Sequence, residues 1–373
     1  MDLLEHQGKT IFRQHGIRIP VGVLWPALPP CDGRWVVKAQ VPAGGRGKRG
    51  GIRFAESPAQ AVELARQMAD ERFDGLPVAG VYLEQRLDIV RELYLAITVD
   101  RDLRCLVVLA SPHGGVEVEK APADGLLRLP IDPLLGLCEF HAAEACRVLA
   151  LPEQVQEQAA VIVRALYGLM LAEDASLAEI NPLALTRTGE LVAADAKITL
   201  DDAAAFRRKG AGQIAAQRPA GGSPFEAGCA EAGAVGIELD PEGEVVAVVS
   251  GAGLMMATLD ILAESGLRLR AAVDLGGTVL AGGSTLARVF DAVSRAQAPF
   301  TFFNAYLHTA LSDELAKMLI EAHRMAPLQG QVLVRLKGRN GAVGRDLLSA
   351  AGFQVFEDLA PAIAAVARRG EAA

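Results

Sequence analysis

The stretch that decides the fold is RWVVKAQVPAGGRGKRGGIRF, residues 34–54. It begins as an apolar strand that carries Lys38, crosses a glycine-rich loop, and resumes as a second strand. The loop contains the glycines at positions 44, 45, 47, 50 and 51. Formally, Gly45, Gly47 and Gly50 satisfy the G-x-G-x-x-G pattern. That pattern needs a following helix to place its N-terminus under a pyrophosphate, and here a strand follows, which argues against a dinucleotide fold.

The loop is also strongly basic, with cations at Arg46, Lys48 and Arg49. A glycine-rich hairpin of this composition predicts a flap whose backbone amides and cations close over a polyphosphate. For this segment taken alone, a mobile basic surface loop is the alternative. The neighbouring segments decide between the two.

Length and composition limit the number of domains, the fold class and the kinds of partner. The 373 residues predict two or three folded units, and 51% hydrophobic with 22% charged residues is typical of an α/β protein and excludes disorder as the main state. The net charge of −8 argues against a protein that binds nucleic-acid backbones by counterion release. Any bound phosphate must therefore be held by a local site.

The cysteines and the N-terminus indicate the compartment. Five cysteines without CxxC spacing read as reduced thiols, and the trio Cys138, His141 and Cys146 reads as buried small residues rather than as a metal cluster. The N-terminus MDLLEHQGKT lacks the apolar run of a signal peptide, and no stretch reaches about 18 consecutive apolar residues. We expect a cytoplasmic protein.

A break in periodicity divides the chain. Residues 207–234 are rich in Gly, Ala and Pro, so we expect a first domain at 1–207, a linker at 208–234 and a second domain at 235–373. In the second domain, short apolar strands alternate with helices, which predicts parallel pairing through βαβ crossovers and a flavodoxin-like, doubly wound sheet. The expected strands are 244–250, 269–275, 300–304 and 332–336, with helices at 253–266, 284–296, 310–325 and 342–351, then a last strand and helix.

The N-terminal part predicts an α+β arrangement. An amphipathic helix over 1–16 carries Leu3, Leu4, Ile11 and Phe12 on one side and ends at Gly16. The other expected elements are strands at 34–40, 52–54, 81–85, 93–99 and 105–110 and helices at 58–72 and 152–171.

Two acids border a short polar bend between strands. Glu84 ends one strand and Glu92 begins the next, so the two carboxylates are placed to bracket an adenine amino group and a ribose hydroxyl. Ordinary solvated charges are the alternative for this pair taken alone.

A hairpin in residues 176–202 concentrates polar side chains inside apolar strands. Glu179 and Asn181 alternate with apolar residues and share a face, the turn falls at Thr188–Gly189, and the returning strand ends with Asp195 and Lys197. Polar residues at this density are costly unless used. The oxygens of Glu179, Asn181 and Asp195 suit Mg²⁺, which predicts a metal site.

These segments together resemble an ATP-grasp fold, and the chain resembles the β subunit of succinyl-CoA synthetase (succinate–CoA ligase) over nearly its whole length. The matching blocks are MDLLEHQGKTIF, WVVKAQVPAGGRGKRGG, RELYLAI, HGGVEVEK, AEINPLAL and SGAGLMMATLDIL. Several blocks in the right order are far more specific than any one of them.

The resemblance implies roles for individual residues. Lys38 and the amides of Gly45, Arg46 and Gly47 would hold nucleotide phosphates, and Glu179 would help position a phosphohistidine. The nucleoside pocket would comprise Glu84, Leu87 through its backbone, and Glu92, and the Mg²⁺ ligands would be Asn181 and Asp195. The histidine and the CoA site would belong to an α subunit, in an αβ or (αβ)₂ assembly that serves the tricarboxylic acid cycle.

Two segments depart from the family pattern where the acid and its phosphate are expected. Leu307, His308 and Thr309 replace a Gly-Gly-Ile turn, and Ser250 replaces an Asn. Thr309 or Ser312 is expected to cap the helix that follows. Three accounts stay open: His308 substitutes for a backbone contact in an active enzyme, the acid is another dicarboxylate such as malate, or the subunit is a silent scaffold. Pro20, near the expected base pocket, resembles the ATP-using members of the family, and this resemblance favours ATP over GTP.

Overall fold

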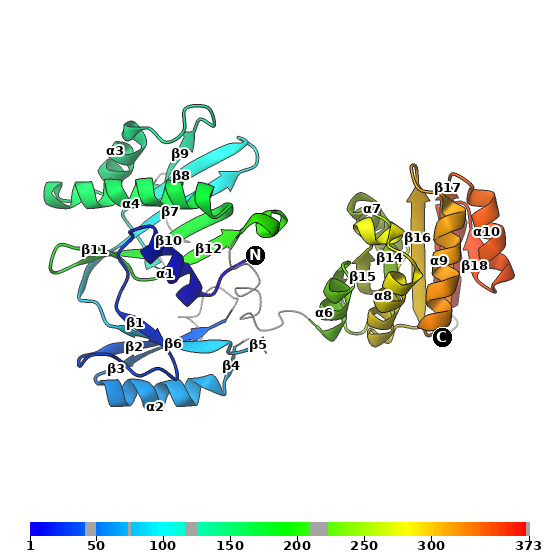
Figure 1. Cartoon of the computed structure of the whole chain (residues 1–373), viewed down its shortest axis with the longest axis horizontal. Helices are drawn as coiled ribbons and strands as arrows, with labels where there is room; N and C mark the ends of the chain where they lie inside the picture. Colours follow the sequence, from blue (N-terminus) through cyan, green and yellow to red (C-terminus); the bar gives the residue numbers. More distant parts are fainter. Residues whose placement is uncertain (42–49, 74–75, 116–124, 209–222, 371–373) are drawn as a thin grey trace. The chain divides into compact units, whose positions relative to one another are not determined.

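The chain folds into two units that meet in sequence between Pro219 and Ala220. A computed structural model describes residues 1–41, 50–73, 76–115, 125–208 and 223–370 (Figure 1). Each unit has its own sheets and its own hydrophobic core. The loop residues Gly45, Arg46 and Gly47 lie outside the described residues.

The first sheet of the N-terminal unit is four-stranded, in the order β1-β6-β2-β3, and all its pairs are antiparallel. The strands are β1 (Gly22–Leu24), β2 (Trp35–Gln40), β3 (Ile52–Ala55) and β6 (Gly80–Gln85). Ser57 is the N-cap of helix α2 (Pro58–Ala69), and its side chain accepts a hydrogen bond from the amide of Gln60. The helix covers one face of this sheet. A short ribbon, β4 (Arg72–Phe73) with β5 (Leu76–Pro77), follows.

The second sheet of this unit is antiparallel, with the order β11-β10-β7-β8-β9 and with β12 also paired to β10. Helices α3 (Glu139–Val148) and α4 (Glu153–Ala172) pack against it through one large apolar core. The strands are β7 (Ile89–Asp100), β8 (Cys105–Ser111), β9 (Leu127–Ile131), β10 (Ala175–Thr186), β11 (Leu191–Ala193) and β12 (Lys197–Leu200).

Helix α1 (Glu5–Gln14) connects the two sheets. Its Ile11 and Phe12 belong to the core of the second sheet, whereas its Glu5 and Lys9 form ion pairs with strands of the first. The helix is shorter than the expected 1–16: Leu4 stays extended, and its amide donates to Gln7 Oε1. The expected terminator is confirmed, because Gly16 adopts a φ of +77°.

The C-terminal unit is a doubly wound sheet, as expected. Its order is β13-β15-β14-β16-β17-β18, in which all pairs are parallel except that of β13 with β15. Leaving out β13, this is the flavodoxin order 2-1-3-4-5. The strands are β13 (Val235–Glu238), β14 (Val245–Val249), β15 (Leu269–Asp274), β16 (Phe300–Leu307), β17 (Gln331–Gly338) and β18 (Gln354–Phe356).

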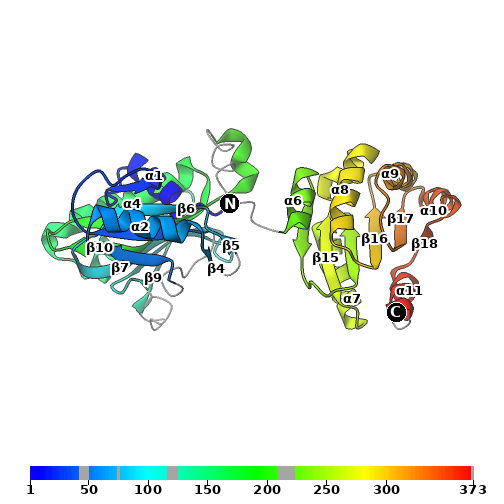
Figure 2. The ribbon, with the colours of Figure 1, turned by 90° about the horizontal axis from the view of Figure 1, so that it is seen from below.

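Helices cover both faces of this sheet (Figure 2). On one face lie α7 and α11, and on the other lie α6, α8, α9 and α10. Their bounds are α6 (Pro224–Glu231), α7 (Ala252–Glu264), α8 (Gly283–Arg295), α9 (Ser312–Met325), α10 (Gly341–Ala350) and α11 (Leu359–Gly370). Because α7 follows β14 on one face and α9 follows β16 on the other, the topological switch point lies at the carboxyl ends of β14 and β16.

Three local expectations are wrong. Helix α6 lies inside the stretch read as linker, and a capping box between Ser223 and Glu226 fixes its start. The returning strand of the 176–202 hairpin is split into β11 and β12, with Asp195 in the break between them. Neither Thr309 nor Ser312 caps α9, because Leu311 occupies the N-cap position.

No helix within the described part of the chain is long and apolar enough to cross a membrane.

Candidate functional site

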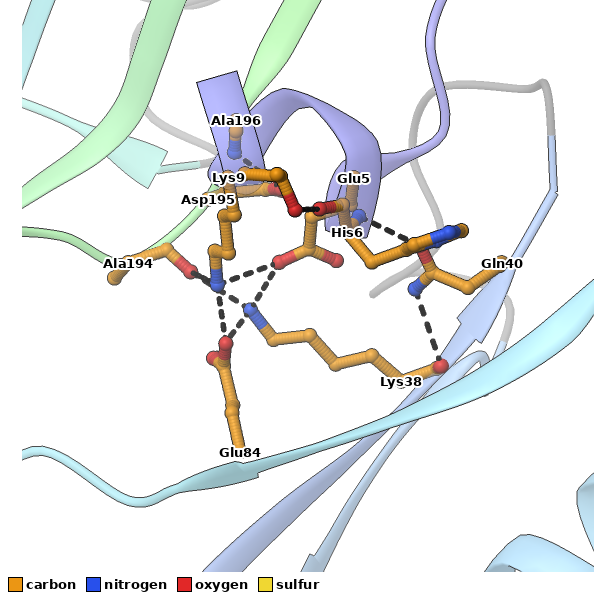
Figure 3. A network of polar contacts seen from close by, with 10 residues as sticks. Glu5, His6, Lys9, Lys38, Gln40, Glu84, Ala194, Asp195 and Ala196 are labelled. Atoms are coloured by element: carbon orange, nitrogen blue, oxygen red, sulfur yellow. Dashed lines mark hydrogen bonds and ion pairs between the residues drawn. The ribbon is translucent and has the colours of Figure 1, made fainter. Parts of the chain in front are cut away.

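Lys38 lies on β2 at the centre of a buried polar cluster, only 6% exposed (Figure 3). Its Nζ donates to Glu5 Oε1 at 2.8 Å and to the carbonyl oxygen of Ala194 at 2.8 Å, and it lies 2.6 Å from Glu84 Oε1. The sheet register explains the approach, because Lys38 and Glu84 lie on the adjacent strands β2 and β6. The three partners thus come from α1, β6 and the segment after β11.

A second lysine enters the same cluster. Lys9 Nζ lies 2.9 Å from Glu5 Oε1, donates to the Ala194 carbonyl oxygen at 2.8 Å, and pairs with Glu84 Oε2. Sequence reasoning missed both Glu5 and Lys9. The available signal was an oppositely charged i,i+4 pair on the turn before the buried Ile11 and Phe12.

The cluster holds Lys38 in its charged form. Burial by itself would lower the pKa of Lys38, but the carboxylates of Glu5, Glu84 and Asp195 together raise it well above its usual range. Lys38 therefore stays protonated throughout the physiological pH range. Removing one member of a buried charge cluster typically costs about 3–5 kcal/mol, because it leaves an uncompensated charge.

Asn181 and Asp195 face each other across the antiparallel β10 hairpin. The pairs Leu183↔Ala193 and Glu179↔Lys197 keep one register, and the amide of Ala194 donates to Pro182 O at 3.1 Å, so Asn181 lies opposite Asp195. Both side chains are half-buried. The Asp195 carboxylate is close enough to Lys38 to raise the pKa of that lysine, whereas the Asn181 side chain is hydrogen-bonded to the backbone of Gly115.

Glu179 lies on the same face of β10 as Asn181, two residues away. Its Oε2 accepts a hydrogen bond from the Tyr94 hydroxyl at 3.4 Å. Burial, with the nearby Glu179 carboxylate, raises the pKa of Tyr94 far above its usual value, so this hydroxyl remains a donor.

The two acids expected to bracket a nucleoside have different neighbours. Glu84 points to the two lysines, whereas the exposed Glu92 lies on β7, where its side chain lies against Gly115. Gly115 in turn donates to Asn181 Oδ1 at 2.6 Å, which links Glu92 to the hairpin. Leu87 is half-buried in the connection between β6 and β7.

The switch point of the C-terminal unit gathers the residues that depart from the family pattern. Ser250 follows β14, and its Oγ accepts from the Tyr306 amide at 3.4 Å. Leu307 ends β16 with its side chain buried, while His308 and Thr309 are exposed. None of these turn residues has a positive φ, so the turn does not need glycine. Among the described non-glycine residues, positive φ occurs at Arg104, Ala150, Asp174, Gln297 and Asn340.

Hydrogen bonds between the side chains of Thr258, Asn304 and Arg335 lie next to this turn. Asn304, fully buried on β16, donates to Thr258 Oγ1 at 2.8 Å and accepts from Arg335 at 3.3 Å. The Arg335 guanidinium also lies over the Tyr306 ring, 5.3 Å from its centroid. The His308 ring packs against the same Tyr306 ring in a T-shaped arrangement, with 4.4 Å between centroids.

His141 has a structural role at the start of α3. Its Nδ1 accepts from the amide of Cys138 at 3.0 Å, and its Nε2 lies 3.1 Å from Pro130 O. Cys146 donates to Gln156 O. All five cysteines are free thiols.

The chain is similar in sequence to curated proteins along almost all of its length. It is 35% identical to the succinate–CoA ligase [ADP-forming] subunit beta of Pyrobaculum calidifontis over 96% of each chain. It is 37% identical to that of Rubrobacter xylanophilus over 94% of this chain and 92% of the relative. The family model of the ATP-grasp domain matches residues 2–185.

The fold is similar to that of solved structures. ATP citrate lyase of Methanothrix soehngenii, in complex with citrate and coenzyme A, matches 99% of each chain with a TM-score of 0.76 at 17% identity. A D541A mutant of the Methanosaeta concilii enzyme matches 95% of this chain and 94% of its own, with a TM-score of 0.70. Because the curated relatives are 35% and 37% identical to it over 96% and 94% of its length, the chain belongs to the ATP-grasp family of succinate–CoA ligase β subunits.

Proposed function

We propose that the chain binds Mg-ATP in its N-terminal unit and, with an α subunit, converts succinate, CoA and ATP to succinyl-CoA, ADP and phosphate. The observation that carries this proposal is the buried, protonated Lys38, which lies among the carboxylates of Glu5, Glu84 and Asp195. The register of the β10 hairpin puts Asn181 at the position opposite Asp195. The whole-length similarity to ADP-forming β subunits supports the choice of nucleotide, with GTP as the alternative.

In this proposal the nucleotide phosphates meet Lys38 and the amides of Gly45, Arg46 and Gly47. A protonated Lys38 supplies a fixed positive charge, and phosphoryl transfer depends mainly on positioning and charge neutralisation. The nucleoside is proposed to lie near Glu84, Leu87 and Glu92, which stand near the end of β6, in the β6–β7 connection and near the start of β7. Glu84 contributes there chiefly by holding the lysines, because both its oxygens are engaged by them.

The donor set fits Mg²⁺. Asn181 Oδ1, on β10, and the Asp195 carboxylate, in the break between β11 and β12, are hard oxygen donors at opposite positions of the hairpin. Two protein ligands are typical when nucleotide phosphates complete the coordination sphere. The ion, when bound, neutralises phosphate charge. Asn181 accepts from the Gly115 amide, which fixes the orientation of its oxygen toward one side of the hairpin.

Glu179 is proposed to orient the phosphohistidine that the α subunit would present. Its position two residues from Asn181 on one strand face puts a carboxylate beside the proposed metal ligands. A carboxylate that accepts from an imidazole N–H fixes the ring's tautomer and leaves the other ring nitrogen to carry the phosphoryl group. The hydrogen bond from Tyr94 holds Glu179 for this task.

The carboxylate substrate and its phosphate are proposed to bind at the switch point, near Ser250 and His308. In open α/β sheets, ligands bind outside the carboxyl ends of the strands at this point. Because the Leu307 side chain is buried, only its backbone is offered, together with the side chains of His308 and Thr309. An imidazole here favours an acid with an additional polar group, so malate is the second candidate.

The experiment is a thioester assay. The chain, its cognate α subunit, Mg²⁺, ATP and CoA are incubated with succinate, malate or itaconate in turn, and acyl-CoA is measured. The proposal expects thioester with succinate and none without the α subunit. Absence of thioester with all three acids would contradict the proposal and favour a catalytically silent scaffold subunit.

A further inference from the structure

The cluster around Lys38 contains two lysines and two glutamates, all almost completely buried. The exposed fractions of Glu5, Lys9, Lys38 and Glu84 are 3%, 0%, 6% and 3%. Charges at this depth must be compensated, since a buried ion without a partner is strongly unfavourable. Among these four residues the two positive and two negative charges balance, and the half-buried Asp195 carboxylate lies nearby. Nothing in the proposed function uses Lys9.

The two ammonium groups share the same three partners. Lys9 and Lys38 both contact the Glu5 carboxylate, the Glu84 carboxylate and the carbonyl oxygen of Ala194 (Figure 3). An ammonium has three N–H donors, so the three contacts of Lys38 use all of them. A phosphate oxygen can therefore bind Lys38 only by replacing one of these partners.

The two lysines differ in their freedom to exchange partners. Lys9 lies on α1 one turn after Glu5 and over the Tyr82 ring, 5.5 Å from its centroid, and it has no exposed surface. Lys38 is slightly exposed and lies on the strand that leads directly into the glycine-rich loop. When Lys38 turns to a phosphate, Lys9 still touches both carboxylates.

We propose that Lys9 is a positioning residue for nucleotide binding: it remains on Glu5 and Glu84, and so allows Lys38 to move onto a nucleotide phosphate. Without Lys9, Lys38 would be the sole cation between two buried carboxylates, and its transfer to phosphate would leave both of them uncompensated. This inference rests on the proposed role of Lys38 as a phosphate ligand.

The test compares the affinities of the full chain for Mg-ATP and for adenosine, measured by calorimetry or competition. Lys9→Met should weaken Mg-ATP binding on the order of 100- to 1,000-fold, as expected for an uncompensated buried charge, and leave adenosine binding within about threefold. Lys9→Arg should bind like the unsubstituted chain. Arg13→Met, which removes an exposed cation from the same helix, is the matched control and should have no effect.

A compensating substitution separates positioning from a general structural defect. Lys9→Met/Glu5→Gln again leaves one net negative charge when Lys38 turns to phosphate, as in the unsubstituted chain, so Mg-ATP affinity should recover to within about threefold. Recovery supports the inference even if Lys9→Met alone fails to fold. Unchanged Mg-ATP affinity in Lys9→Met, equal losses for ATP and adenosine, or no recovery in the double variant overturns it.

Lys38→Met distinguishes failure of the inference from failure of the proposed function. If Lys38→Met weakens Mg-ATP binding and Lys9→Met does not, only the role of Lys9 is wrong. If Lys38→Met binds Mg-ATP normally, the phosphate site itself lies elsewhere, and the role of Lys9 is overturned with it.

Discussion

Asp195 is the single residue on which the proposed metal site depends most. By register it stands opposite Asn181, and its carboxylate is close enough to Lys38 to raise the pKa of that lysine. Asp195→Ala removes a charged Mg²⁺ donor, so we expect Mg²⁺-dependent phosphoryl transfer to fall at least about 100-fold. The rate is measured with radiolabelled ATP, and Asp102→Ala, which removes an exposed carboxylate of the same unit, is the control. Retained transfer in Asp195→Ala would remove the metal assignment.

His6 gives the edge of the cluster a pH dependence. Burial lowers the pKa of His6, although the hydrogen bond with Gln40 and the charge of Glu5 oppose this, and the ring stacks on Tyr82. Below about pH 6.5 the unfolded chain takes up a proton at this histidine before the folded chain does. The free energy of unfolding should therefore fall as the pH drops through this window.

Denaturant unfolding at pH 7 and pH 5 measures the effect. His6→Gln should lose less stability between the two values than the unsubstituted chain does. An equal loss in both chains would contradict the role of His6.

For individual residues, the sequence predicts the placements that follow from alternation along a strand. Alternation along one strand put Glu179 and Asn181 on one face, and the hairpin turn put Asp195 opposite. The sequence does not predict the Lys9–Glu84 and Lys38–Glu5 pairs, whose partners are 75 and 33 residues apart. Such pairs depend on how α1 docks, which no local pattern specifies.

Helix α1 docks closely because residue 8 is a glycine. A Cβ built at Gly8 would lie 3.2 Å from the Ala196 Cβ, which is tight but tolerable for one methyl group. Gly8→Val adds two more methyl groups and should push α1 away, at a cost of about 1–3 kcal/mol in unfolding free energy. Because α1 carries Glu5 and Lys9, Mg-ATP affinity should fall as well.

Gly168→Val is the matched control for this substitution. Gly168 also lies within a helix, α4, but a Cβ there meets nothing within 4 Å, so stability and affinity should stay close to those of the unsubstituted chain. Thermal unfolding and calorimetry of the two variants decide the matter. If the two glycines respond alike, close docking of α1 is not what fixes the cluster.

Among the elements, the βαβ alternation of the C-terminal unit was the clearest signal, and its flavodoxin order is confirmed. Helix α6 and strand β13 were missed as elements of the sheet domain for different reasons. The helix has an alanine- and glycine-rich sequence whose main start signal is the Ser223–Glu226 box. The strand joins antiparallel at the edge beside β15, outside the crossover rule that predicts the other strands.

The whole molecule distributes its chemistry over two units. The proposed nucleotide and metal residues Lys38, Asn181 and Asp195 belong to the N-terminal unit, and the proposed substrate residues Ser250 and His308 lie at the switch point of the C-terminal unit. In the proposed reaction each unit handles a phosphate, and the histidine that carries the phosphoryl group between them belongs to the α subunit. Composition alone suggests a protein that acts by itself, whereas the motifs indicate one subunit of a two-subunit enzyme.

The most direct test of this division is the location of a labelled phosphoryl group. The chain is mixed with its cognate α subunit, Mg²⁺ and ATP labelled on the γ-phosphate, and the subunits are separated under conditions that preserve phosphohistidine. The account predicts acid-labile label on a histidine of the α subunit, none on the six histidines of this chain, and release of the label by succinate with CoA. Label on this chain, or none on the α subunit, would contradict it.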